Sequence, residues 1–341
     1  MNNPVNINTP LILGPVQRSE PLLSRPIPFT YALERFYMDV RDGFRINSRG
    51  RLYAPGGHLP FVQLFNWVKK HEDIYGETDL YNISDRWLKH FIRFLYDSPL
   101  ALNTVSGLVA NIHAVINALI TDGMPLTRLT QRVCPEIADS VYNPETELET
   151  MIQASFNHDA LFEARDIFII QSYVGFRVGT LMKFLKKPEL YLFSKTDPHT
   201  KTTQWFIRIR TNKTGVFVVI PVKKIVYDIL ERRKFTFTEV YYERYYNQLL
   251  RTMAKEAGII QPVTYGMTIS GRYQEFVEAK YELMSSHTAR RNFATNAFLS
   301  GIPVDNIIWI TGHKTRESFW RYVQADNLAN AYLIADHKYF A

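Results

Sequence analysis

Residues near the C-terminus have the types and spacing needed to attack a phosphodiester with a phenol. His287 and Arg290 are three residues apart, Gly312-His313 follows, and Tyr322 comes nine residues after His313. In such a reaction a tyrosine oxygen attacks phosphorus, cations neutralise the non-bridging oxygens, and an acid protonates the leaving 5′-oxygen. A tyrosine pKa of about 10 leaves the phenol protonated at neutral pH, so neighbouring cations or an imidazole must activate it. We predict that Tyr322 is the nucleophile.

Two arginines and a lysine are the predicted sources of positive charge and of the proton. Arg177 and Arg290 are expected to clamp the phosphate, because a planar guanidinium binds two oxygens and keeps its charge. Arg290 lies one helical turn after His287, which puts both side chains on one helix face. Lys213, in the turn 212–215, is predicted to protonate the leaving oxygen, since desolvation among cations lowers the pKa of a lysine.

The two histidines allow either phosphate chemistry or metal binding. His287 and His313 could bond the phosphate, assist proton transfer or position Tyr322, but imidazoles are also the commonest metal ligands. The sequence has no H-E-x-x-H motif and no carboxylate at ligand spacing beside either histidine. Arginines can supply the charge that Mg²⁺ would bring, so we predict a reaction that needs neither a metal nor another cofactor.

Each of these residue types also has an ordinary structural role. The chain contains 20 tyrosines, most of which are expected to pack in the core. A lysine in a turn is more often solvated than catalytic, and a single H-x-x-R pair is a weak signal. The order and spacing of the whole set therefore carry the prediction.

The half of the chain from 147 to 341 is predicted to hold these residues on a mixture of helices and strands. The expected elements are an apolar helix over 164–173, strands over 204–211 and 216–221 joined by an Asn-Lys-Thr-Gly turn, and helices from 222 to the C-terminus. Ser285 or Ser286 is expected to cap the helix with the H-x-x-R pair, and Pro303 to start the next one. Thr315 is expected to cap a last helix that bears Tyr322.

Residues 29–127 are predicted to form a separate all-helical domain. Ser84 is a suitable N-cap for a helix through Tyr96, and apolar residues at helical spacing run from about 103 to Gly123. One stripe of the first of these helices is basic and consists of Arg86, Lys89 and Arg93. Taken alone, this stripe is better explained as a solvated surface. Beside a half that could cleave DNA, we predict that it contacts phosphates.

Charge is concentrated in one part of the chain. The formal net charge is +7, and residues 201–256 hold twelve Lys or Arg against five Asp or Glu, which equals the excess of the whole chain. Such a segment fits a polyanionic partner, and we predict that Arg208 and Arg210 within it bind DNA. A solvated surface would give the same composition.

The flanking segments and the cysteine content bound the class of protein. Residues 1–28 contain six prolines and are predicted to be a flexible arm, and residues 128–146 a linker. The single Cys134 excludes a disulfide framework. No run approaches the length of a membrane span and no secretion signal is present, so the expected location is the cytoplasm.

Together, these motifs resemble the C-terminal signature of the tyrosine recombinases, the phage-integrase family. The shared series is H-x-x-R, then G-H, then Y, and the intervals from His287 to His313 and from His313 to Tyr322 match the usual family spacing. Residues 102–105, which lead into a long helix, resemble more weakly the family's core-binding domain.

Two upstream segments resemble further motifs of the same family. Residues 175–181 are similar to its first arginine box, with Thr180 where an acid is usual, and residues 211–215 to its β-hairpin lysine box. The usual acid orients the catalytic loop, so Thr180 puts that support in doubt unless a neighbour replaces it. Arg291 stands where the family often has a histidine and is expected to contact DNA.

The resemblance implies a two-domain fold and a defined reaction. The fold would be an all-α, SAM-like core-binding domain followed by a mixed α+β, mainly helical catalytic domain with a small β-sheet. The implied protein is a site-specific recombinase, an integrase of a bacterial mobile element or phage, which cuts and rejoins duplex DNA through a 3′-phosphotyrosyl intermediate without ATP. Implied partners are double-stranded recombination sites, other copies in a homotetramer, and accessory DNA-bending or directionality proteins.

Three other functions remain open from the sequence. A type IB topoisomerase uses similar chemistry without strand exchange, although the spacing from Gly312-His313 to Tyr322 favours a recombinase. A catalytically inactive DNA-binding regulator could share the fold, with Thr180 as its main support. A metal-dependent nuclease would lose its activity in EDTA.

Overall fold

The chain forms two compact units. The computed structural model describes residues 26–341 except 213–214, 239–242, 314, 325–330, 332–334, 336–338 and 340–341. The first unit ends at Glu136 and also includes Thr268–Arg272, and the second unit takes the remaining residues from Ile137 onward. The predicted arm therefore lies almost entirely outside the described residues.

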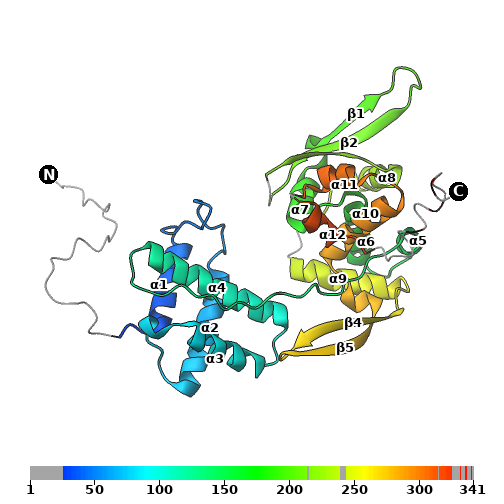
Figure 1. The fold of residues 1–341 in the computed structure, drawn as a ribbon. Helices are drawn as coiled ribbons and strands as arrows, with labels where there is room; N and C mark the ends of the chain where they lie inside the picture. Colours follow the sequence, from blue (N-terminus) through cyan, green and yellow to red (C-terminus); the bar gives the residue numbers. More distant parts are fainter. Residues whose placement is uncertain are drawn as a thin grey trace, which may run out of the picture. The chain divides into compact units, whose positions relative to one another are not determined.

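The first unit is helical, as predicted (Figure 1). Its helices are α1 (Phe29–Arg41), α2 (Leu59–Tyr75), α3 (Asp85–Tyr96) and α4 (Leu102–Thr121), with a 3-10 turn at Leu80–Asn82. The hydroxyl of Ser84 accepts a hydrogen bond from the backbone of Trp87, so the predicted cap of α3 is confirmed. One face of each helix supplies the core, including Leu33, Leu64 and Phe91.

Helix α4 is the most apolar element of this unit. It is long and apolar enough, by length and composition only, to cross a membrane, which the sequence analysis did not recognise. Seven of its side chains are buried in the core of the first unit, from Val105 to Leu119. Packing within the unit accounts for these apolar residues.

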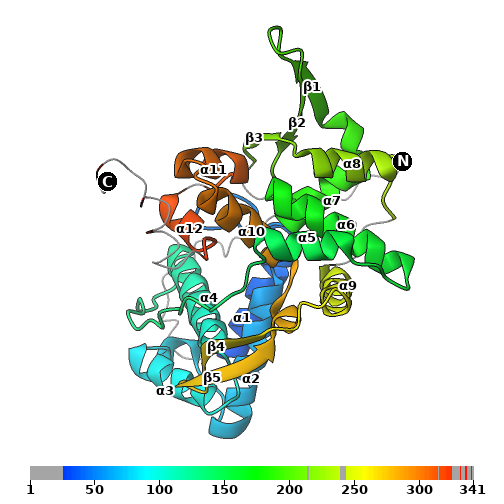
Figure 2. The ribbon, with the colours of Figure 1, turned by 90° about the vertical axis from the view of Figure 1, so that its right-hand side faces the viewer.

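The second unit combines eight α-helices in its described part with a three-stranded sheet and most of a two-stranded hairpin. The helices are α5 (Glu145–Gln153), α6 (Asp159–Val174), α7 (Val178–Lys186), α8 (Lys224–Arg232), α9 (Glu243–Glu256), α10 (Ser286–Leu299), α11 (Val304–Thr311) and α12 (Arg316–Trp320). Helix α6 is buried on nearly all sides and packs against α9 and α10 (Figure 2). A buried central helix gives α10 a fixed surface from which to present the H-x-x-R pair.

Three antiparallel strands form the first sheet in the order β1-β2-β3. Their bounds are β1 (Leu192–Thr196), β2 (Thr203–Arg210) and β3 (Phe217–Pro221). The predicted strands β2 and β3 are confirmed, and β1, which was not predicted, pairs with β2 from Leu192↔Ile207 to Thr196↔Thr203. Figures 1 and 2 both show the β1–β2 hairpin projecting from the helices of its unit.

A second hairpin corrects the prediction that only helices, with breaks between them, follow residue 222. Strands β4 (Pro262–Ile269) and β5 (Arg272–Ala279) form a two-stranded sheet between α9 and α10. Ser270 and Gly271 join them with φ values of +52° and +69°, the left-handed backbone that tight hairpin turns require. The Ser-Gly pair between segments rich in Thr, Tyr and Val was a usable strand signal.

Candidate active site

Helix α10 begins at a double cap that fixes the H-x-x-R pair. Ser285 is the N-cap, one of the two predicted, and it forms a capping box with Thr288. The Oγ1 of Thr288 accepts a hydrogen bond from the Ser285 backbone at 3.0 Å. A capping box satisfies two otherwise unpaired N–H groups, so the first turn of α10, with His287 and Arg290, has a defined start.

The Arg290 side chain is buried among main-chain carbonyls. It is 2% exposed, Nη1 donates to the oxygen of Gly175 at 2.6 Å, and Nη2 donates to the oxygen of Thr311 at 2.8 Å. Among the described residues, none accepts a hydrogen bond from the buried Nε. Burial, and then the charge of Arg177, lower the pKa of Arg290, while the Tyr322 phenol opposes that shift. The guanidinium still remains a cation at neutral pH.

Gly175 brings its carbonyl close to Arg290 because no side chain is in the way. It ends α6 in the left-handed conformation with φ of +67°. A Cβ at this position would lie 2.6 Å from the ring of Phe293, which is closer than real contacts allow. Arg177, two residues later, is the N-cap of α7. The turn between α6 and α7 therefore carries Arg177 and binds Arg290 through the Gly175 carbonyl.

His313 is held in one tautomer by its two partners. Its Nε2 lies 2.9 Å from Nη2 of Arg290, which can only donate, so Nε2 is the acceptor. Its Nδ1 lies 2.7 Å from the hydroxyl of Thr311 and must carry the proton of the neutral ring. The Thr311 hydroxyl in turn donates to the oxygen of Ile307 at 2.7 Å. Burial, and then the charges of Arg290 and Arg177, lower the pKa of His313 to about 3.

The Tyr322 ring lies beside both of these groups. Its ring centroid is 5.2 Å from the guanidinium carbon of Arg290 and 4.9 Å from the centre of the His313 ring. Its backbone is fixed by a bond from its N–H to the oxygen of Phe319 and another from the Thr295 hydroxyl to its carbonyl. Thr315 caps α12 as predicted, but α12 ends at Trp320, so the helix does not bear Tyr322. The tyrosine lies just beyond it.

His287 and Arg291 lie at the edge of this cluster. Partial burial and the charge of Arg291 lower the pKa of His287, with further lowering by Arg290 and Arg177 and an opposing effect of Glu243. Burial lowers the pKa of Arg291, and the nearby Tyr322 opposes part of that shift. His287 therefore lies in the electrostatic surroundings of Arg290, and Arg291 in those of Tyr322.

Lys213 lies outside the described residues, but the chain directly before it is anchored. The Oγ1 of Thr180 accepts a hydrogen bond from the Asn212 backbone at 3.2 Å. The side chain of Asn212 donates to the oxygen of Gly179 at 2.7 Å. Thr180, which stands where the family usually has an acid, is 3% exposed and ties this loop to the start of α7.

The predicted DNA-binding residues lie on exposed surfaces. Arg86, Lys89 and Arg93 project from one side of α3, and Arg93 forms an ion pair with Asp97. Arg208 and Arg210 are exposed on β2. These exposed positions are compatible with contacts to DNA.

Thr311 is the site residue that sequence reasoning missed. It supplies both a carbonyl to Arg290 and a hydroxyl to His313, and it is 2% exposed. The only sequence signal is its position directly before Gly312-His313. In the part of the chain that the structure describes, no three His, Cys, Asp or Glu side chains gather in a group that could hold a metal ion.

Solved structures of other proteins resemble this chain in fold. No protein-family model and no curated protein matches this sequence. The XerH site-specific recombinase, in a post-cleavage complex with its palindromic difH substrate, has a TM-score of 0.59 at 14% identity, over 90% of this chain and 84% of XerH. A lambda integrase tetramer bound to a Holliday junction gives 0.58 at 14% identity, over 88% and 78%.

The third structure is an integrase of the transposon Tn1549 with transposon right end DNA. It gives a TM-score of 0.58 at 12% identity, over 92% of this chain and 100% of that one. The three likenesses each extend over both units of this chain. The helical first unit and the mixed second unit together have the fold of the tyrosine recombinases.

Proposed function

We propose that this chain is a site-specific DNA recombinase that cuts and rejoins duplex DNA through Tyr322. The Tyr322 oxygen attacks a phosphorus atom, the bond from phosphorus to the 5′-oxygen breaks, and a 3′-phosphotyrosyl link forms. The 5′-hydroxyl of a partner strand then attacks that link and releases the tyrosine. Each step exchanges one phosphate ester for another, so no ATP is consumed.

The observation that carries this proposal is the meeting of Arg290, His313 and Tyr322 from three separate segments. These segments are α10, the turn after α11 and the turn after α12. Two of the five N–H groups of Arg290 are not used by Gly175, Thr311 or His313, so the side chain keeps donors for a phosphate oxygen. Positive charge fixed in a buried site stabilises the charge that develops in the transition state.

Proton movement follows from the state of the imidazole. With its pKa lowered to about 3, His313 is neutral and its Nε2 faces the arginine–tyrosine pair as an acceptor. It therefore positions the Arg290 guanidinium as a neutral hydrogen-bond acceptor. We assign protonation of the leaving 5′-oxygen to Lys213, supported by the anchoring of the neighbouring Asn212 to α7.

DNA and other copies of this chain are the partners in the proposed reaction. The XerH, lambda and Tn1549 structures each contain DNA, and the lambda integrase is a tetramer on a junction. We propose likewise that this chain binds specific duplex sites and acts as a homotetramer. The basic stripe on α3 and Arg291 would contact phosphates, without a metal ion in the reaction.

The experiment that tests the proposal looks for the covalent intermediate. Nicked suicide duplexes from DNA flanking the gene are incubated with the protein in EDTA, and denaturing gels reveal any protein–DNA adduct. We expect an adduct that maps by mass spectrometry to the peptide containing Tyr322 and that is absent in Tyr322→Phe. Tyr31→Phe, an exposed tyrosine of α1, is the matched control and should leave the adduct unchanged.

Each of the other outcomes would point to a different nucleophile or a different function. An adduct that persists in Tyr322→Phe means another nucleophile. Relaxation of supercoiled plasmids without a specific site indicates a topoisomerase. Cleavage that EDTA abolishes indicates a metal-dependent nuclease, and tight binding to flanking fragments with no adduct indicates a regulator.

A further inference from the structure

The three-stranded sheet has one face in the core and one face exposed. Ile207, Ile209, Val218 and Ile220 point inward and are at most 2% exposed. The alternate residues of the same strands point outward because side chains alternate along a strand. Phe193, Phe217 and Val219 on this outer face are 40%, 53% and 47% exposed.

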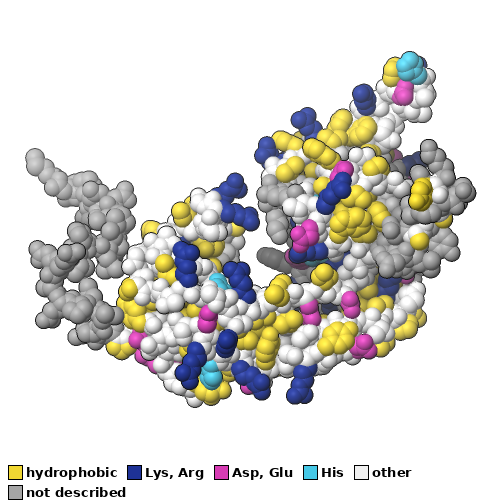
Figure 3. Space-filling model, in the orientation of Figure 1, with side chains coloured by type: hydrophobic (Ala, Val, Ile, Leu, Met, Phe, Trp, Pro, Cys, Tyr) yellow, Lys and Arg dark blue, Asp and Glu magenta, His cyan; other side chains and the backbone are white. Residues whose placement is uncertain are grey.

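Aromatic and basic side chains are interleaved on the outer face. Phe193 and Phe206 are cross-strand partners whose rings stack at 5.4 Å with an interplanar angle of 20°. Further along β2, the guanidinium of Arg210 lies 4.4 Å and that of Arg208 5.5 Å from the centre of the Phe217 ring. Figure 3 shows basic and hydrophobic side chains next to each other where this sheet projects.

The charge of this sheet is entirely positive. Strands β1, β2 and β3 contain no Asp or Glu, and their outer face also carries Lys195, the cross-strand partner of Gln204. The three strands themselves therefore offer a polyanion no negative side chain, although Asp197 follows β1 in the turn to β2. The rings add a second requirement, because burying them is favourable only against an apolar or aromatic surface.

A single strand of nucleic acid offers both negative charge and unpaired bases that can cover the rings. A duplex offers only the negative charge. Paired bases stack on each other within a duplex, so a duplex would offer mainly phosphates to a flat sheet and leave the rings in water. Unpaired bases can stack on aromatic side chains while arginines hold the backbone, the combination found in sheets that bind single strands. An acidic protein segment would match the charge but not the rings.

We propose that the outer face of the β1–β2–β3 sheet binds single-stranded DNA, with bases stacked on Phe193, Phe206 and Phe217 and phosphates held by Arg208 and Arg210. The five residues named here are different from Arg290, His313 and Tyr322. The inference does not rest on the proposed recombinase reaction, because binding is measured without cleavage.

The test measures binding of fluorescent oligothymidylate by anisotropy to the full chain carrying Tyr322→Phe, which prevents an adduct. Phe193→Ala and Phe217→Ala should each weaken binding about tenfold, since stacking of one base is typically worth that factor. An abasic strand of the same length has the phosphates without the bases, and the two variants should bind it as the parent does. Phe44→Ala and Arg272→Ala, exposed residues outside this sheet, are the matched controls.

Two results would overturn the proposal. In the first, both phenylalanine variants bind oligothymidylate as tightly as the parent. That result would mean that the rings do not contribute and that the arginines of this face bind the phosphates of a duplex. In the second, the abasic strand or a polyglutamate competes as well as oligothymidylate, which shows that charge alone drives binding. Both phenylalanines lie outside the buried core, at 40% and 53% exposure, so circular dichroism should show that the variants are folded.

Discussion

Arg290 is fixed by the fork of its guanidinium, and this explains why lysine should not replace it. Two Nη atoms reach the oxygens of Gly175 and Thr311 on opposite sides of the side chain. A lysine ammonium is a single point and cannot reach both while also facing a phosphate. We expect Arg290→Lys to lower the rate of adduct formation at least about a hundredfold, the typical loss for one transition-state donor.

The measurement for that substitution is single-turnover cleavage of a suicide duplex, with binding followed separately by anisotropy. Arg316→Lys is a suitable control, because Arg316 pairs with Asp305 on the exposed surface. Equal cleavage rates in Arg290→Lys and the parent would remove Arg290 from the site.

Thr311 controls His313 without contacting DNA in our proposal, so its effect should be indirect. Thr311→Val keeps the shape and the carbonyl but removes the hydroxyl that accepts from Nδ1 of His313. The Nδ1–H group of the ring then loses its acceptor, while Nε2 stays bonded to Arg290, so the imidazole is held less firmly. We expect cleavage to slow about tenfold, which is less than the loss of a general acid–base group itself. Thr311→Ser should restore the parent rate, and failure of serine to do so would argue for a packing role.

The sequence predicted the members of this site better than their contacts. Residue type and spacing are local properties, and they pointed to Arg290, His313 and Tyr322, which the structure brings together. The role of Thr311 and the carbonyl of Gly175 depends on how α6, α10 and α11 meet, which a one-dimensional pattern does not contain. The state of the histidine likewise follows from its partners in space.

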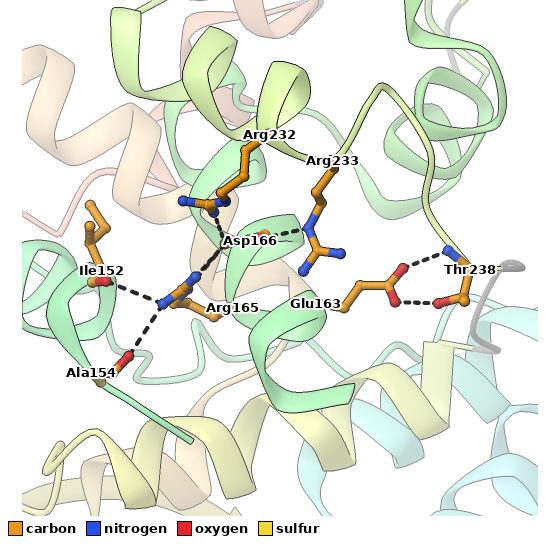
Figure 4. A network of polar contacts seen from close by, with 8 residues as sticks. All are labelled: Ile152, Ala154, Glu163, Arg165, Asp166, Arg232, Arg233 and Thr238. Atoms are coloured by element: carbon orange, nitrogen blue, oxygen red, sulfur yellow. Dashed lines mark hydrogen bonds and ion pairs between the residues drawn. The ribbon is translucent and has the colours of Figure 1, made fainter. Parts of the chain in front are cut away.

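At the scale of elements, α6 and α8 are joined by a buried carboxylate (Figure 4). Asp166 is 2% exposed and accepts from Arg165 of its own helix at 2.9 Å, from Arg232 at 2.9 Å and from Arg233 at 2.5 Å. Glu163 of α6 similarly holds the backbone and hydroxyl of Thr238. One helix thus fixes both the end of α8 and the chain that follows it.

Removing the charge of Asp166 should destabilise the second unit strongly. Asp166→Asn leaves Arg165 buried without its counter-charge, and breaking a buried pair typically costs about 3–5 kcal/mol. Asp228→Asn in α8 breaks an exposed pair with Lys224 and should cost about 1 kcal/mol or less. Urea unfolding followed by far-UV circular dichroism compares them, and equal midpoints would show that Asp166 contributes little.

Helix starts that depend on the local sequence were predicted correctly. Elements whose position depends on contacts with distant parts of the chain were not. Ser84, Ser285 and Thr315 cap helices because a hydroxyl satisfies the first backbone N–H groups wherever the helix lies. Strand β1 is mostly exposed, and its order comes from pairing with β2 rather than from its own apolar pattern. Helix α12 stops before Tyr322, where Tyr322 turns toward Arg290 and His313.

At the scale of the whole molecule, each unit buries a neutral histidine. His71 of α2 is 3% exposed among aromatic rings, and its Nε2 lies 3.0 Å from Nδ1 of His90. Burial, and then His90, lower the pKa of His71 to about 4, and His313 of the second unit has its pKa lowered to about 3. Both units therefore have a group that takes up a proton more readily when unfolded.

Acid should weaken the first unit through His71. The unfolded histidine has a pKa near 6.5, so the stabilisation is fully present above that pH and is lost as the pH falls toward about 4. The loss approaches about 1.4 kcal/mol for each pH unit within this window. Hydrogen exchange of α2 and α3 peptides between pH 7 and 5 measures it, with rates corrected for intrinsic exchange. His71→Phe should flatten the dependence, His199→Ala in an exposed turn should not, and an unchanged slope in His71→Phe would assign the acid sensitivity to other groups.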